Sequence, residues 1–291
     1  MNAFMDRFFK GKIKARKADC REAYVKRADG SELRLCIYSG KNQMGKVPGV
    51  LWIHGGGYAI GVPEIEIPFV NRLMGKMDCV IVSPDYTRST EAPYPAALED
   101  CYLALLWMKD HAQECGIREN QLFTGGESAG GGLAAALSLL ARDRGEVAIA
   151  FQMLLYPMLD DRMVMESARN NDAPVWNTKS NACAWKLYLG ELYGSDEVPA
   201  YAAPARAHDY RNMPPTCTMA GTIEPFFDET REYVKRLKES GTKVRFKKFP
   251  ECYHGFDIVA SKSSVGKAAI QYYRNAFRYA AEHFFAEQKK R

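Results

Sequence analysis

The sequence predicts an α/β fold in which a mostly parallel β-sheet is covered by helices on both faces. Two observations lead to this prediction. Wholly apolar segments of strand length recur along the 291 residues, and amphipathic segments of helix length separate them. Strands that are buried on both faces appear as continuous apolar runs, and strands that alternate with helices form parallel sheets. The 47% hydrophobic content lets a chain of this length bury a large core.

The individual elements can be assigned in chain order. Residues 21–38 alternate between polar and apolar side chains around a turn at residues 28–31, which predicts a β-hairpin. Apolar strands are expected at residues 49–53, 79–83, 121–124, 151–156 and 216–220, and a strand with basic residues on one face at 244–249. Helices are expected at residues 67–77, 96–115, 128–144, 227–240 and 264–287.

Residues 158–213 interrupt this alternation. The segment is polar, contains Pro174, Pro199 and Pro204, and shows a helical pattern near residues 180–193. Because it is too long for an ordinary connection between a strand and a helix, we expect a helical cap inserted over the strand ends. The whole chain, residues 1–291, then forms one domain.

Composition and charge argue against several functional classes. The net charge of +5 is small and the lysines and arginines are scattered, so no nucleic-acid-binding surface is expected. No apolar run is long enough to span a bilayer, and the first residues lack the apolar stretch of a secretion signal. The eight cysteines form no Cys-x-x-Cys pair and the five histidines lack ligand spacing, which predicts reduced thiols, no metal site and no cofactor. A cytoplasmic location is expected.

The strongest functional motif is Gly126-Glu127-Ser128-Ala129-Gly130. It lies between the expected strand 121–124 and a helix rich in alanine and leucine. A Gly-x-Ser-x-Gly sequence at such a junction makes a sharp turn that exposes the serine hydroxyl at the end of the sheet. Ser128 is therefore the predicted nucleophile, and Glu127 is a supporting neighbour.

A serine hydroxyl needs a base to become nucleophilic, and an imidazole is the usual base near neutral pH. His254 follows the last expected strand after a short loop and is the predicted base. His111 and His283 lie within expected helices, where a role in packing or at the surface is the default. His208 lies in the expected cap.

A glycine-rich turn, His54-Gly55-Gly56-Gly57, follows the expected strand 49–53. Glycines allow backbone N–H groups to converge on one point, as an oxyanion hole requires. The expected donors are the N–H groups of Gly56, Gly57 and Ala129. We expect His54 to hold the loop by hydrogen bonds, with Gly55 as part of the turn.

The acid that orients the base should follow a strand between the serine and the histidine in chain order. The expected strand 216–220 leads to Glu224, and Pro225 is typical of the first turn of a helix. This places Glu224 in the loop before the helix and Asp228 inside it. Glu224 is the first candidate for the acid and Asp228 is the second.

These residues resemble the bacterial hormone-sensitive-lipase family of α/β-hydrolase esterases. The segments His54–Gly57 and Gly126–Gly131 look like its two signature motifs, and the likeness runs from about residue 47 to residue 285. Residues 201–207, 213–216 and 253–256 are similar to the later sequence blocks of that family. The resemblance implies the α/β-hydrolase fold, a triad of serine, acid and histidine, and a cap to which about residues 1–20 contribute.

Three features depart from the family pattern. The family usually has aspartate where Glu224 stands, and arginine where Thr87 stands. Loss of that arginine is expected to remove a buried ion pair. The chain before His54 is short, which implies a reduced N-terminal part of the cap and a more open pocket.

The function expected from the motifs and the resemblance is a serine carboxylic ester hydrolase that acts on small to medium acyl esters through an acyl-enzyme. An amidase or deacetylase with the same triad, and a hydrolase-like ligand receptor, are the alternatives. The expected partner is a small-molecule ester. Family members often dimerise through the last strand, so the resemblance also implies a possible homodimer. The basic residues of segment 243–248 could instead protect that strand edge from pairing.

Overall fold

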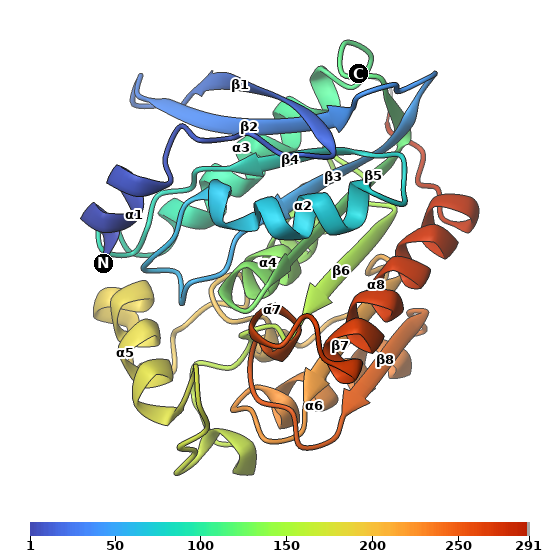
Figure 1. The fold of residues 1–291 in the computed structure, drawn as a ribbon. Coiled ribbons are helices and arrows are strands. Elements are labelled where there is room, and N and C mark those ends of the chain that lie inside the picture. Colours follow the sequence, from blue (N-terminus) through green and yellow to red (C-terminus); the bar gives the residue numbers. More distant parts are fainter. Residues whose placement is uncertain (290–291) are drawn as a thin grey trace.

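The computed structural model describes residues 1–289. Its centre is an eight-stranded sheet in the order β1-β2-β4-β3-β5-β6-β7-β8 (Figure 1). The strands are β1 (Ala18–Lys26), β2 (Glu32–Gly40), β3 (Val47–Ile53), β4 (Val80–Pro84), β5 (Ile117–Glu127), β6 (Phe151–Leu155), β7 (Thr216–Gly221) and β8 (Val244–Phe249). The β1–β2 and β2–β4 pairs are antiparallel, and all pairs from β4 to β8 are parallel. The predicted mostly parallel sheet is confirmed.

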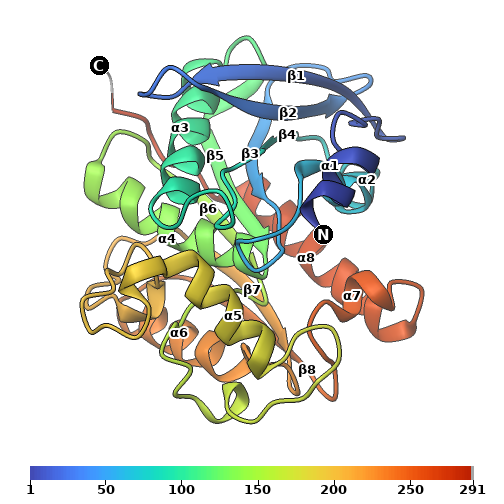
Figure 2. The ribbon, with the colours of Figure 1, turned by 90° about the vertical axis from the view of Figure 1, so that its left-hand side faces the viewer.

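Helices cover both faces of this sheet (Figure 2). They are α1 (Asn2–Phe8), α2 (Ile67–Met74), α3 (Ala96–Asp110), α4 (Ala129–Arg144), α5 (Thr178–Leu189), α6 (Phe227–Glu239), α7 (Phe256–Val259) and α8 (Ser264–His283). The buried side chains divide into two cores. One joins the sheet to α3, α4, α5 and α6, and the other joins it to α2 and α8. This two-sided burial explains why the central strands are apolar throughout.

The largest differences from the expected elements occur at their ends. The expected helix 96–115 ends at Asp110, and β5 begins at Ile117 rather than at residue 121. Ile117 already pairs with Val47 of β3, so sheet pairing extends this strand beyond its apolar part. The last helix ends at His283 rather than at residue 287.

Between β6 and β7 the chain leaves the sheet, and this part includes residues 158–213, for which the sequence predicts a cap. This segment contains α5 and several short 3-10 turns. Helix α5 packs with Trp185 and Tyr188 against Tyr58, at ring-centroid distances of 5.5 and 3.9 Å. Helix α1 lies near the same region, since Asn2 donates to the carbonyl of Ala59 at 2.9 Å. Both segments therefore contact the loop that follows β3.

Thr87, where the family usually has arginine, contacts a buried carboxylate. Asp100 on α3 accepts from the backbone N–H and the hydroxyl of Thr87, each at 2.7 Å. Arg27, in the turn of the β1–β2 hairpin, reaches the same carboxylate from Nε at 2.6 Å and from Nη2 at 3.0 Å. Arg27 therefore supplies the cation for Asp100.

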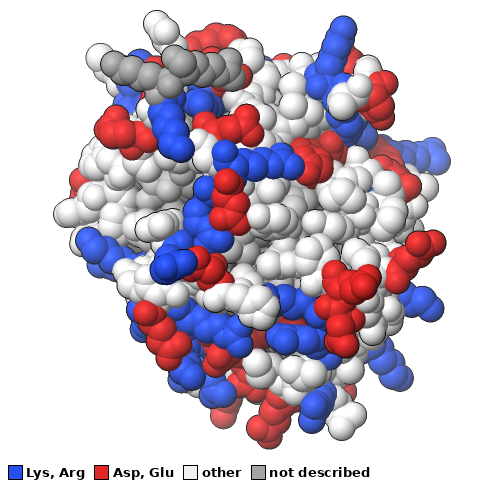
Figure 3. Space-filling view, turned by 180° about the vertical axis from the view of Figure 1, so that it is seen from behind, with Lys and Arg blue, Asp and Glu red and all other residues white. Residues whose placement is uncertain are grey.

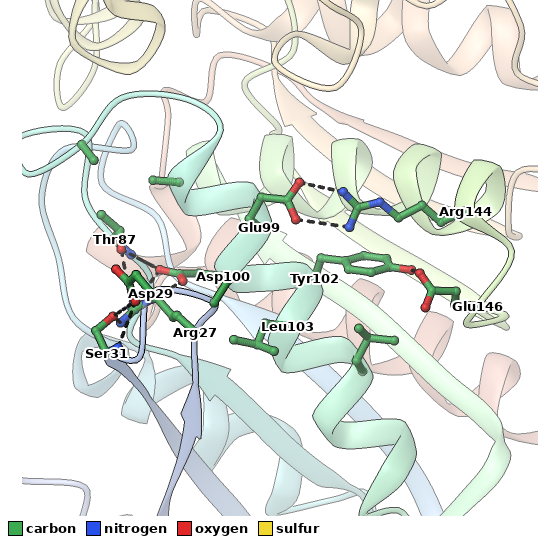
Figure 4. A pocket seen from close by; sticks show the side chains of 14 residues that line it. Arg27, Asp29, Ser31, Thr87, Glu99, Asp100, Tyr102, Leu103, Arg144 and Glu146 are labelled. Carbon is green, nitrogen blue, oxygen red and sulfur yellow. Dashed lines mark hydrogen bonds and ion pairs between the residues drawn. The ribbon is translucent and has the colours of Figure 1, made fainter.

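These groups line a cavity of about 790 Å³ beside the hairpin turn and α3 (Figure 4). The other charged side chains around it also have partners. Arg144 meets Glu99 at 2.7 Å, the Tyr102 hydroxyl donates to Glu146 at 2.8 Å, and Asp29 accepts from Ser31. Ion pairs and hydrogen bonds within the chain therefore account for the charged groups of the cavity.

Replacement of Arg27 by alanine should lower the free energy of unfolding by about 2 kcal/mol, because it leaves the buried Asp100 carboxylate without its cation. Chemical denaturation of both proteins measures the change. The control is Arg211→Ala, which removes an ion pair to Asp209 whose side chains are 77% and 47% exposed. We expect the control to change stability by less than about 1 kcal/mol. Equal effects of the two variants would contradict the buried role of Arg27.

Charged residues of both signs are intermingled on the face opposite to that of Figure 1 (Figure 3). No helix among the described residues is long and apolar enough to cross a membrane.

Candidate active site

Ser128 lies in the sharp turn between β5 and α4. Its backbone has φ 57° and ψ −123°, a conformation that L-residues rarely adopt. The turn also requires a close approach of two backbone segments, because a Cβ atom on Gly130 would collide with the carbonyl oxygen of Ile53. The Gly-x-Ser-x-Gly sequence therefore folds here as a strained strand-to-helix turn, which we call the elbow (residues 126–130).

His254 and Glu224 meet Ser128 from the ends of β8 and β7, which lie beyond β6 in the sheet. His254 follows β8, and its Nε2 lies 2.8 Å from Ser128 Oγ. Its Nδ1 is hydrogen-bonded to Glu224 Oε2. Glu224 follows β7, is fully buried, and accepts from the Gly221 backbone N–H at Oε1 over 2.6 Å. The structure thus brings the three residues into one hydrogen-bonded row.

Burial raises the pKa of Glu224, and the facing imidazole together with the Gly221 N–H opposes that rise. The hydrogen bond at Nδ1 leaves Nε2 as the ring nitrogen that faces the serine. An imidazole held in this way can accept the hydroxyl proton.

Asp228 lies apart from His254. It is inside the first turn of α6, accepts from the Ser167 N–H at 3.0 Å and pairs with Arg231 at 3.1 Å. Of the two acids that the sequence left open, the structure brings Glu224 and not Asp228 to the imidazole.

The turn that follows β3, residues 54–57, lies directly against the elbow. Gly56 has φ +117°, and a Cβ atom there would collide with the carbonyl oxygen of Ile60. A Cβ atom on Gly55 would lie 3.1 Å from the carbonyl oxygen of Glu127. We call residues 54–57 the oxyanion turn. The name refers to the oxyanion hole that the sequence predicts from the N–H groups of Gly56, Gly57 and Ala129.

His54 is held inside this turn. Its Nδ1 lies 2.8 Å from the carbonyl oxygen of Gly55, and its ring stacks on Tyr86 at 4.2 Å. The Tyr86 hydroxyl donates to the carbonyl of His54 at 3.1 Å. Burial lowers the pKa of His54 to about 4, so the ring is neutral near pH 7. These contacts agree with a role in holding the loop.

Aromatic side chains surround the His254 ring. The rings of Tyr156, Phe226 and Trp176 lie at centroid distances of 4.8, 5.0 and 6.4 Å. Trp176, from the segment before α5, also touches the oxyanion turn, because a Cβ atom on Gly57 would collide with its ring. Such a lining limits the access of water to the imidazole and strengthens its electrostatic interactions.

Trp176 belongs to the aromatic residues that the sequence places in the expected cap and its rim, and the structure brings its ring beside His254. Glu66 also lies beside this site, but the sequence does not predict it. It lies in a short 3-10 turn (Pro63–Glu66), where an acidic residue before a helix usually faces water, and no motif or spacing marks it.

One group of side chains has the donors for a metal ion, namely Glu22, Cys36 and Glu64. Arg34 occupies this position, with Nη1 2.9 Å from Glu22 and 2.7 Å from Glu64. The guanidinium already neutralises both carboxylates, so the group is explained as an ion-pair network.

Comparison with known proteins finds a matching fold family and relatives that are named esterases. The model of a family described as alpha/beta hydrolase fold matches residues 50–258. Esterase LipI of Mycobacterium tuberculosis is 33% identical over 212 residues, which cover 72% of this chain and 66% of LipI. Carboxylesterase NlhH of the same organism is 30% identical over 213 residues, which cover 72% of this chain and 66% of NlhH. The aligned part spans just under two thirds of both relatives.

A solved structure of a bacterial heroin esterase has the same fold over nearly the whole chain. The two structures superpose with a TM-score of 0.90 at 36% sequence identity. The superposition covers 96% of this chain and 90% of the heroin esterase chain.

Proposed function

We propose that this protein is a serine carboxylic ester hydrolase, because the chain belongs to the hormone-sensitive-lipase-like family of α/β-hydrolase fold proteins. The observation that carries the proposal is the hydrogen-bonded row from Ser128 through His254 to Glu224, at the ends of three strands. The relatives named as esterases support the same reaction class.

The proposed reaction proceeds in two acyl-transfer steps. Ser128 Oγ attacks the ester carbonyl carbon while His254 Nε2 accepts the hydroxyl proton. The N–H groups of Gly56, Gly57 and Ala129 stabilise the negative charge on the carbonyl oxygen. Glu224 keeps the imidazole oriented and stabilises its protonated form.

The first step ends when the protonated imidazole donates its proton to the departing alkoxide, so that the alcohol leaves and the acyl group stays on Ser128. In the second step water attacks this ester while His254 accepts one of the protons of the water molecule. The imidazole then returns this proton to Ser128 Oγ as the bond between Oγ and the acyl carbon breaks, and the carboxylic acid is released. The reaction needs no cofactor.

A panel of p-nitrophenyl esters with acyl chains of increasing length tests this function and the open pocket together. We expect hydrolysis of short and medium esters, with kcat/KM changing by less than about tenfold for each added methylene. The matched p-nitroanilides separate an esterase from an amidase, and we expect them to react far more slowly. A strict limit at acetyl would contradict an open acyl side, and faster anilide cleavage would favour the amidase. Absence of hydrolysis of either series would favour a ligand receptor.

We further propose a single domain, residues 1–291, with cap elements at about residues 1–20 and 158–213. The contacts of α1 and α5 with the loop after β3 support this division.

We propose a cytoplasmic location for the protein. The free cysteines support this location, because thiols stay reduced in the cytoplasm.

We also propose a homodimer formed through β8, which is the last strand of the sheet order and has one neighbour, β7. The side chains of Arg245 and Lys247 lie over the rings of Tyr279 and Phe249, at 4.2 and 4.8 Å. Because both cations lie over rings of the same chain, they leave the backbone N–H and C=O groups of the free edge of β8 accessible to a second chain. Light scattering should give about twice the monomer mass of 32.7 kDa. A monomer mass at micromolar concentration would contradict the dimer.

A further inference from the structure

Two carboxyl groups meet where the oxyanion turn contacts the elbow. Glu66 is 3% exposed and accepts a hydrogen bond from Trp52 Nε1 at Oε2 over 2.9 Å. The backbone N–H of Gly55 favours the ionised form of the same carboxyl group. Trp52 and Gly55 lie on either side of the end of β3, so Glu66 fixes the start of the oxyanion turn.

Glu127 completes the connection from the other side. It directly precedes Ser128, and its carboxyl group is hydrogen-bonded to that of Glu66. A Cβ atom on Gly55 would lie 3.4 Å from Glu127 Cγ and 3.5 Å from Oε1. The hydrogen bond between the two carboxyl groups therefore joins the oxyanion turn to the elbow.

Such a hydrogen bond needs a proton between the two groups, because two carboxylates in contact repel each other away from water. Burial raises the pKa of Glu66 to about 7. Burial, followed by the charges of Glu66 and Asp257, raises the pKa of Glu127 well above the usual carboxyl range. Near neutral pH the pair therefore holds a proton, which can form the hydrogen bond between the two groups.

The surroundings provide one weak donor for a second charge. The Tyr156 hydroxyl lies 3.5 Å from Glu127 Oε2, but it lies closer to Asp257 on α7, to which it donates at 2.8 Å. Burial raises the pKa of Asp257 as well. Arg72 on α2 favours the ionised form of Glu127, but no ion pair between them is recorded among the described residues. The titratable and charged groups that face the two carboxyls are Arg72, Tyr86, Tyr156 and Asp257.

We propose that Glu66 and Glu127 share one proton and act as positioning residues that hold the oxyanion turn against the nucleophile elbow. This inference rests on the proposed esterase function. The oxyanion hole combines two N–H groups from the turn with one from the elbow, so its geometry depends on how these two segments sit against each other. Stabilisation of an oxyanion requires donors that are already in place when the charge develops.

The effect should appear in kcat, because the oxyanion forms in the transition state and not in the bound substrate. Glu66→Ala removes the acceptor for Gly55 and for Glu127, and we expect kcat to fall on the order of 10 to 100-fold with little change in KM. Glu127→Gln keeps a neutral donor of nearly the same shape. We expect it to retain kcat within about threefold near neutral pH.

The pH profile separates this role from a merely structural one. In the wild-type protein, loss of the shared proton at alkaline pH leaves two repelling carboxylates, so kcat should fall as pH rises. Glu127→Gln has no such proton, and its kcat should stay level over the same range. The control is Glu229→Gln, which changes a buried carboxyl that accepts from the Leu159 N–H at 2.7 Å, away from the turn. It should keep the wild-type profile.

Identical pH profiles for the wild type and Glu127→Gln would overturn the proposal, even if Glu66→Ala failed to fold. A fall in kcat of similar size for Glu127→Gln and Glu66→Ala would also overturn it, because the neutral donor would then not suffice. Covalent labelling of Ser128 by a fluorophosphonate, measured on the same proteins, keeps the two claims apart. If Ser128 is labelled and the profiles are identical, this inference fails while the esterase function stands; without labelling, the function itself fails.

Discussion

Replacement of Ser128 by alanine should reduce the turnover of a p-nitrophenyl ester by about a millionfold, because the acyl group loses the atom that would carry it. The remaining activity would come from the oxyanion hole and from substrate binding alone. The fold should persist, since alanine fits the space of serine and the strained backbone at φ 57° is determined by the turn around it. Steady-state kinetics with active-site titration measures the loss.

The matched control for this substitution is Ser138→Ala. Ser138 lies on the same helix, is buried, and donates to the carbonyl oxygen of Ala134 at 2.9 Å. Its loss should cost about 1 kcal/mol of stability and leave turnover within about twofold. A comparable loss of activity in both variants would mean that damage to α4, and not loss of a nucleophile, explains the result.

Replacement of Glu224 by alanine should reduce kcat by about ten thousandfold, because the imidazole loses the group that selects its tautomer and stabilises its charge. Asp228→Ala should change kcat by less than about fivefold, since that carboxylate serves Ser167 and Arg231. The comparison uses kcat on one ester with both variants confirmed as folded. A larger loss for Asp228→Ala would overturn the assignment of the acid.

A third variant tests whether the side-chain length of the acidic residue matters for kcat. Glu224→Asp keeps the carboxylate but shortens its reach by one methylene, both toward His254 Nδ1 and toward the Gly221 N–H. A displacement of about 1 Å in such an arrangement can cost about a hundredfold. We therefore expect Glu224→Asp to lie between the wild type and Glu224→Ala. Full activity of the aspartate variant would show that the longer side chain is not needed.

Much of the fold and the candidate site could be predicted because short segments of sequence specify them. The apolar runs of the central strands follow from burial on two faces, and β8 begins and ends at the expected residues. Ser128, His254 and Glu224 each follow a strand within a few residues, and the edge of a parallel sheet brings such loops together.

The remaining features depend on contacts between segments that are distant in sequence. Arg27 pairs with Asp100 only because the hairpin lies beside α3 in the folded chain. Glu66 meets Glu127 because η1 (Pro63–Glu66) lies against the end of β3. Strand β5 begins early because Ile117 pairs with Val47. None of these contacts has a local pattern, so a single sequence does not predict them.

The central claim is that Ser128 carries the acyl group during catalysis. A fluorophosphonate tests it most directly, because the nucleophile forms a bond to phosphorus and expels fluoride, and the adduct is stable enough for mass spectrometry of the digested protein. We predict one adduct per chain, on the peptide that contains Ser128, and none in Ser128→Ala. An unlabelled wild-type protein, or equal labelling of Ser128→Ala, would contradict the account.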